Sequence, residues 1–137
     1  TLEELNRTSP STQGGNTAFA PYFDGASYLN MLSTEQVRSC VTFAPGCRNH
    51  WHIHRAARGG GQILLVTAGR GGYQEWGEAP RALRPGDVVN IPPNVKHWHG
   101  AAVDSAFQHL AVEVPGEGSQ NEWCEPVDAA AIGLWRH

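Results

Sequence analysis

Short stretches of hydrophobic or alternating residues, each ended by glycine or proline, recur along most of this chain. The clearest cover residues 37–43, 62–67 and 88–91, which are rich in Val, Ile, Leu and Thr. Runs of this length with β-branched residues predict strands, and the Pro-Gly, Gly-Gly and Pro-Pro-Asn segments that follow them predict tight turns. Less regular strand candidates cover residues 26–32, 73–76, 80–84, 97–101 and 105–114.

The turn signals recur about every 8 to 12 residues between residues 26 and 126. This spacing favours an all-β fold with antiparallel strands, and we predict a double-sheet jelly roll for residues 26–126. Residues 1–20 are polar and rich in Ser, Thr, Gln, Asn and Gly, and we predict an N-terminal arm over residues 1–25. Residues 127–137 predict a short C-terminal helix, which Asp128 can cap and which extends through Trp135. All three parts are expected to form a single domain, because 137 residues suit one hydrophobic core.

The charge composition limits the kinds of molecule that this chain is expected to bind. Charged residues make up 17% of the chain, the net charge is −3 with neutral histidines, and no run of Lys or Arg is present. A basic face for nucleic acid or for an anionic membrane surface is therefore not expected. We expect a small-molecule ligand, with no nucleic-acid partner and no membrane partner.

Cysteine usage and the length of apolar runs bear on the compartment. Cys40, Cys47 and Cys124 are odd in number and lack Cys-x-x-Cys spacing, so a disulfide framework is not expected. None has a flanking base that would mark a nucleophile, so we expect all three to be inert. The sequence shows neither a signal-peptide pattern nor an apolar stretch of about 18 residues. The expected location is the reducing cytoplasm.

Three histidines and one glutamine stand out in two segments marked by glycine and proline. His52 and His54 are two residues apart, and such residues point to the same side of a strand. Neutral imidazole is the commonest protein metal ligand, so both side chains can bind one ion. With His97 and the carboxamide oxygen of Gln62, they predict a metal site that keeps one or two positions for water or substrate. All four ligands are neutral, so a divalent ion would keep its full charge and acidify a bound water or alcohol readily.

Candidate cavity residues lie on the last long strand, residues 105–114. Phe107, His109, Ala111 and Glu113 share one face of it, which places an imidazole where an apolar side chain is usual. The alternative for His109 is a buried imidazole bonded to a carbonyl group. Glu113 can border the pocket or accept a hydrogen bond from His109.

Two further positions follow from strand alternation. His99 lies two residues after His97 and should project to the same side, where it either supports the ligands or fills the barrel. On an earlier strand, alternation leaves open which pair faces the cavity, Ser39 with Val41 or Cys40 with Thr42.

The two histidine segments resemble the motifs of the cupin superfamily. The first motif is a glycine, five residues, His-x-His, a short gap, an acid or amide, six residues and a glycine. The residues in these places are Gly46, His52, His54, Gln62 and Gly69. The gap between His54 and Gln62 is seven residues, where three or four are typical, so residues 55–61 are expected to bulge out as a loop.

The second motif is a glycine, five residues, Pro-x-Gly, two residues and a histidine. Gly86, Pro92 and His97 occupy these places, and Asn94 stands where glycine is usual. Asparagine tolerates a positive φ better than other non-glycine residues, so this departure is mild.

Within cupins the chain is similar to small bacterial single-domain proteins that include manganese-dependent hydroxynitrile lyases. The resemblance covers roughly residues 26–126. It implies a metal-dependent lyase whose ion acts as a Lewis acid on a small hydroxy or carbonyl compound, with (R)-selective cleavage of a cyanohydrin into aldehyde and cyanide. His109 would act as the general base, and the substrate-binding residues would be His99, Glu113, Val41 and Phe107. Related small cupins include oxygenases, so oxidative cleavage of C–C or C=C bonds and non-catalytic small-molecule binding stay open.

The cofactor and the assembly follow from the same residues. Nitrogen and oxygen ligands suit several divalent metals, among which we favour Mn or Fe, with Zn or Ni as alternatives. Edge strands and a polar N-terminal arm suggest a homo-oligomer, either a dimer or a tetramer.

Overall fold

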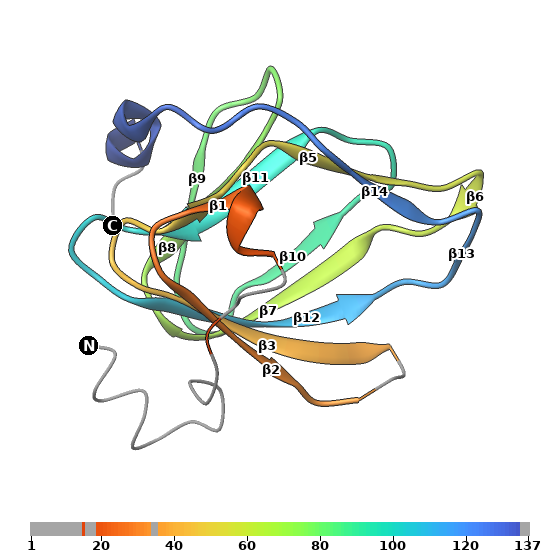
Figure 1. The fold of residues 1–137 in the computed structure, drawn as a ribbon, viewed down its shortest axis with the longest axis horizontal. Coiled ribbons are helices and arrows are strands. Elements are labelled where there is room, and N and C mark those ends of the chain that lie inside the picture. Colours follow the sequence, from red (N-terminus) through yellow and green to blue (C-terminus); the bar gives the residue numbers. More distant parts are fainter. Residues whose placement is uncertain (1–14, 16–18, 34–35, 135–137) are drawn as a thin grey trace.

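The computed structural model describes residue 15, residues 19–33 and residues 36–134. Over these residues two antiparallel sheets face each other, and Figure 1 shows the strands of one above those of the other. The predicted all-β jelly roll is confirmed. None of the helices in the described ranges has the length and apolar character needed to traverse a bilayer.

One sheet contains the strands with the clearest hydrophobic patterns. In spatial order these are β10 (Val88–Ile91), β7 (Gln62–Gly69), β12 (Phe107–Glu113), β3 (Val37–Phe43) and β2 (Ser27–Met31). All neighbouring pairs are antiparallel. The pairing of β12 with β7 shifts register between Gln108 and His109. Irregularities of this kind change the direction of nearby side chains and are frequent next to binding sites.

The second sheet is built around β11 (His97–Ala101), which pairs with three other strands. These are β8 (Gly71–Glu75), β4 (Arg48–Asn49) and β5 (His52–Arg55). The sheet is completed by β9 (Arg81–Leu83) on β8, β1 (Phe23–Asp24) on β4 and β14 (Gln120–Trp123) on β5. The pairing of β5 with β11 and β14 decides the geometry of the histidine cluster.

Alternate side chains of the two sheets meet in the hydrophobic core. Phe43, Leu64 and Phe107 are completely buried there. Burying a leucine or phenylalanine side chain stabilises a fold by about 1.5–3 kcal/mol, so these residues are major contributors to stability. The same alternation directs other side chains of β3 and β12 toward a cavity between the sheets.

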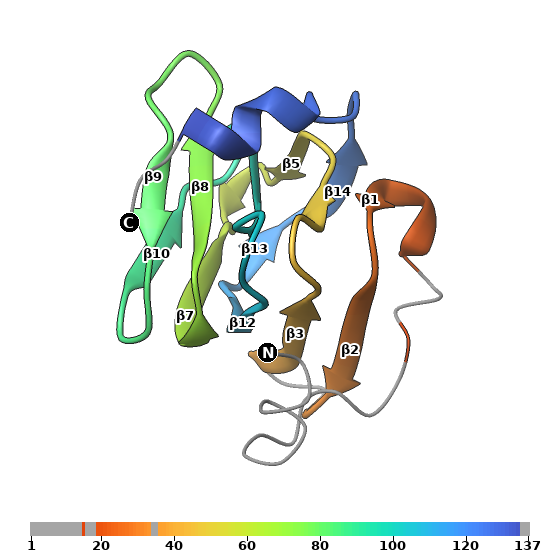
Figure 2. The same cartoon turned by 90° about the vertical axis from the view of Figure 1, so that its left-hand side faces the viewer.

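The two ends of the described chain carry short 3₁₀ helices. The predicted C-terminal helix over residues 127–137 is present only as the 3₁₀ helix η2 (Ala129–Leu134), and Trp135 lies outside the described residues. The carboxylate of Asp128 accepts a hydrogen bond from the backbone N–H of Ala130 at 2.9 Å, as a capping residue does. Figure 2 shows η2 running across the top of the molecule.

Most of the predicted N-terminal arm, residues 1–14 and 16–18, also lies outside the described residues. Its last part is structured, because the 3₁₀ helix η1 (Ala20–Tyr22) leads directly into β1.

The segment between His54 and Gln62, predicted as a bulging loop, instead contains a strand. β6 (Arg58–Gly59) pairs with β13 (Gly116–Glu117), and this two-stranded ribbon lies at the end of the molecule opposite η2 in Figure 1. Gly61, where the ribbon returns to β7, has a φ of 94°. A Cβ there would collide with the carbonyl oxygen of Ile91, so this position requires glycine.

Cys40, Cys47 and Cys124 are free in this structure. Cys40 and Cys47 are buried. Burial raises the pKa of the Cys47 thiol to about 12, so it stays protonated and unreactive at neutral pH.

Candidate metal centre

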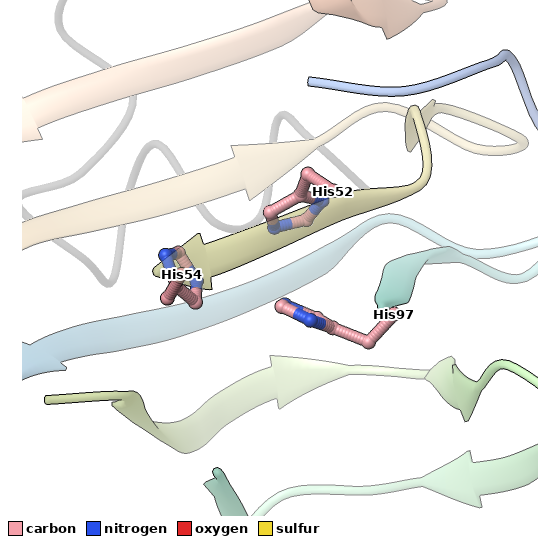
Figure 3. Close-up of side chains that lie close together, drawn as sticks. All are labelled: His52, His54 and His97. Atoms are coloured by element: carbon pink, nitrogen blue, oxygen red, sulfur yellow. The ribbon is translucent and has the colours of Figure 1, made fainter. Parts of the chain in front are cut away.

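Strands β5 and β11 bring three predicted ligands together. His52 and His54 project from the same side of β5, and His97 reaches toward them from the start of β11 (Figure 3). His52 and His97 are direct partners across the ladder. One candidate ligand atom from each of the three rings lies within 4.8 Å of the other two. The three nitrogens are therefore candidates to bind one ion.

Hydrogen bonds fix which nitrogen of each ring is free. Nδ1 of His52 donates to the carbonyl oxygen of His50 at 2.8 Å, and Nδ1 of His97 donates to that of Val95 at 2.9 Å. Nδ1 of His54 donates to the side-chain oxygen of Asn121 at 2.8 Å. Each Nε2 therefore keeps its lone pair, as in metal sites where an outer partner orients the ligand.

Two of these lone pairs are buried without a partner. Among the described residues, Nε2 of His54 and Nε2 of His97 have no hydrogen-bond partner and no exposure to water. A buried polar atom in this state destabilises the fold unless something else binds it. A metal ion at the centre of the cluster would satisfy both atoms, so the residues present fit such an ion.

Two rings of the cluster, those of His52 and His97, stay neutral at neutral pH and therefore suit a cation. Burial, and secondarily the neighbouring His97, holds the pKa of His52 well below its ordinary value of 6.5. Burial also lowers the pKa of His97 to about 3. Protons therefore do not compete for these nitrogens at neutral pH, and the lone pairs remain available.

The predicted fourth ligand, Gln62, begins β7 and lines the same cavity as His52 and His54. Its partners across the sheet are Ile91 on β10 and Glu113 on β12. Three imidazole nitrogens and an amide oxygen suit Mn, Fe, Zn or Ni. Coordination by Gln62 stays a prediction.

A cavity of about 420 Å³ lies beside the histidines. Its lining includes most of the predicted site residues, namely His52, His54, Gln62, His99, His109, Glu113 and Val41. The other apolar residues of its lining are Phe19, Phe23, Leu29, Met31, Ala111, Val114 and Trp123. On β3 the structure decides between the two pairs left open by alternation: Ser39 and Val41 line the cavity, whereas Cys40 and Thr42 do not.

Phe107, predicted as a substrate-binding residue, is not among the residues that line this cavity. It lies on the predicted face of β12, but its ring packs in the core against Phe43, with ring centres 5.9 Å apart. Alternation gives the direction of a side chain but not its depth along the barrel. His109, Ala111 and Glu113 reach the cavity, whereas Phe107 lies in the packed part.

His99 and His109 form a second pair of imidazoles in the cavity wall, with ring centres 4.9 Å apart. Asn49 holds His99: its Oδ1 accepts from the backbone N–H of His99 at 2.9 Å, and its Nδ2 donates to ring Nε2 at 3.1 Å. His109 differs, since neither of its ring nitrogens has a hydrogen-bond partner among the described residues. Burial lowers the pKa of His109 to about 4, an effect that the backbone of Leu110 only partly offsets. The His109 ring is therefore neutral and free to accept a proton.

Three residues at the site were not found from the sequence. Asn121 bonds His54, Asn49 bonds His99, and Trp123 lies 4.7 Å from the ring of His52 between ring centres. Asn121 and Trp123 come from β14, a strand with a weak hydrophobic pattern. Only the pairing of β14 with β5 identifies them, and no local sequence signal predicts that pairing.

The buried histidines predict acid sensitivity of the metal-free protein. Burial lowers the pKa of His97 to about 3 and of His109 to about 4, whereas an unfolded histidine titrates near 6.5. Below pH 6.5 the unfolded state thus binds more protons, so stability falls as the pH decreases toward 4. From pH 7 to pH 5 we expect a loss on the order of 2 kcal/mol for each of the two, at about 1.36 kcal/mol per pKa unit.

Urea unfolding of the metal-free protein at pH 7 and pH 5 would measure this loss. Carboxylates titrate mainly below this window, so they contribute little to the difference. An unchanged unfolding midpoint would show that these rings take up protons in the folded state.

The fold and the histidine cluster together define a cupin. A family model described as a cupin domain matches residues 39–113, more than half of the chain, and the chain belongs to this family. It is a small cupin similar to hydroxynitrile lyases.

The similarity extends to named relatives. Over 87 residues the chain is 47% identical to an (R)-mandelonitrile lyase from Granulicella tundricola, a match that covers 64% of this chain and 63% of that protein. A cupin-like protein of known structure from Thermotoga maritima is 38% identical, with a TM-score of 0.73, over 89% of this chain and 91% of that one. A DMSP lyase from Ruegeria pomeroyi shares the fold at 20% identity, with a TM-score of 0.59, over 91% of this chain and 66% of that one.

Proposed function

We propose that this chain is a metal-dependent lyase that cleaves a small cyanohydrin into an aldehyde and hydrogen cyanide, with preference for the (R) enantiomer. His52, His54, His97 and Gln62 would hold a divalent ion, Mn or Fe. The observation that carries the proposal is the pair of buried, unpartnered Nε2 atoms in the histidine cluster beside the cavity. The similarity to a protein named (R)-mandelonitrile lyase supports the reaction.

The bound ion would supply Lewis acidity, which stabilises negative charge on the substrate oxygen. His109 faces the cavity as a neutral base and would take the proton from the cyanohydrin hydroxyl. The oxygen then forms the carbonyl bond while the bond to the nitrile carbon breaks, and its electron pair leaves with cyanide. The protonated His109 would return its proton to cyanide, so the products are aldehyde and hydrogen cyanide with no change of oxidation state.

The cavity suits a substrate with an apolar body and one polar end. Trp123, Leu29 and Val41 offer apolar surface, and the histidines offer the polar end. A volume of about 420 Å³ accommodates a small molecule but no macromolecule.

Release of benzaldehyde from mandelonitrile would test the proposal. We expect the metal-loaded chain to consume the (R) enantiomer first, to work equally well under nitrogen, to lose activity with a chelator and to regain it with Mn²⁺ or Fe²⁺. Oxygen uptake with substrate would instead indicate an oxygenase, and stoichiometric binding without turnover would indicate a binding protein. Either result would overturn the lyase proposal.

A further inference from the structure

Asn94 occupies a backbone conformation that suits glycine better. Its φ is 64°, and among the described residues it is the one non-glycine residue with a positive φ. Glycine adopts this conformation without strain, whereas a Cβ makes it less favourable. The asparagine side chain makes two hydrogen bonds that glycine could not make.

The Asn94 side chain binds the chain just after the ligand His54. Its Oδ1 accepts from the backbone N–H of Ala56 at 3.1 Å, and its Nδ2 donates to the carbonyl oxygen of Ala56 at 3.0 Å. Its backbone N–H donates to the carbonyl oxygen of His54 at 2.8 Å. The side-chain amide thus behaves like a strand partner and closes a three-bond bridge between segments 38 residues apart in sequence.

This bridge lies where the chain departs from the usual cupin spacing. Ala56 is the base of the ribbon formed by β6 and β13, and the ribbon tip is exposed, with Arg58 at 83% side-chain exposure. The ribbon leads into β14, which carries Asn121, the hydrogen-bond partner of the His54 ring. Asn121 therefore binds the imidazole of His54, and the Asn94 side chain binds the backbone of Ala56, two residues further along the chain.

We infer that Asn94 is a positioning residue that compensates for the lengthened segment between His54 and Gln62. Without its side chain, Ala56 has no tie to the β10–β11 turn, and the motion of the ribbon reaches the backbone of His54. The asparagine in place of glycine is thus linked to the longer gap, because its side chain anchors the lengthened segment. This inference rests on the proposed metal site, because its purpose is to hold a ligand.

The variant Asn94→Gly tests the inference, since glycine suits the backbone conformation, keeps the backbone bond to His54 and removes only the two side-chain bonds to Ala56. We expect the Ala56 amide to exchange with solvent at least about 10-fold faster, because the loss of its bond opens that site. We also expect Mn²⁺ to bind about 10-fold to 100-fold more weakly, the range typical for loss of a group that orients a ligand. The metal-free melting temperature should stay close to that of the parent, because relief of backbone strain offsets the lost bonds.

Asp87→Ala is a matched control. The Asp87 carboxylate accepts from the backbone N–H of Arg84 at 3.0 Å in another turn, and neither residue lines the cavity. Its loss should leave Mn²⁺ binding and Ala56 exchange unchanged. Unchanged Mn²⁺ binding and unchanged exchange in Asn94→Gly would overturn the inference. If the parent itself bound no metal, the proposed function would fail, and Ala56 exchange in the metal-free protein would still test the bridge.

Discussion

Replacing His54 with alanine is expected to abolish metal retention and, with it, cyanohydrin cleavage. His54 supplies one of the three clustered imidazoles, and its buried Nε2 has no other partner among the described residues. The residue is only half-buried, so alanine removes a ligand with little loss of packing. Loss of a group that merely supports a ligand weakens binding by about 10-fold to 100-fold, so loss of the ligand should exceed about 100-fold. Metal content of the purified chain and titration of the metal-free chain with Mn²⁺ would measure the effect.

His50→Ala provides the matched control, because it changes a neighbouring histidine outside the cluster. The His50 ring lies 3.8 Å from the carboxylate of Asp24, and His52 uses only the backbone carbonyl of His50, which alanine keeps. A ligand at 100 times its Kd stabilises a protein by about 2.7 kcal/mol. Added Mn²⁺ should therefore raise the melting temperature of His50→Ala but not of His54→Ala. Full metal content in His54→Ala would place the binding site elsewhere.

The parts of this molecule that the sequence predicts are those in which local patterns suffice. β3, β7 and β10 each combine β-branched residues with a following turn, and their positions follow from that pattern alone. His52 and His54 project from the same side of β5, because residues two positions apart do so in any strand. The two motifs predicted that His97 lies close to these histidines. In the structure the pairing of β5 with β11 places it there.

The parts that the sequence could not predict depend on contacts between strands far apart in the sequence, or on how far along the barrel a side chain lies. Asn121 binds His54 although the two residues are 67 positions apart in the sequence, and no local sequence pattern near either residue predicts this contact. Phe107 and His109 share a face of β12, yet only one reaches the cavity, because packing from both sheets decides where the core ends. The ribbon of β6 and β13 was not predicted, because a run of glycines is typical of an irregular loop. In the structure these glycines adopt positive φ angles, which turn the chain from the ribbon into β7.

Replacing His109 with leucine is expected to remove turnover while leaving the fold as stable as before, or more so. Both ring nitrogens of His109 are buried without partners among the described residues, a condition that destabilises a protein. Leucine has a similar volume and no polar atom, so the free energy of unfolding should hold or rise by on the order of 1 kcal/mol. Loss of the general base should lower kcat by about 10²-fold to 10⁴-fold. Metal content should be unchanged, because His109 lies outside the ligand cluster.

Phe107→Leu separates this chemical role from a packing role. Phe107 is completely buried on the same strand, with its ring centre 5.8 Å from that of His109, but it does not line the cavity. Its truncation should lower the free energy of unfolding by about 1 kcal/mol or more and leave kcat near that of the parent. Urea unfolding and mandelonitrile kinetics on both variants should therefore give opposite patterns. If His109→Leu lost stability and kept its turnover, His109 would be a core residue, and the proton would have to be taken by another group.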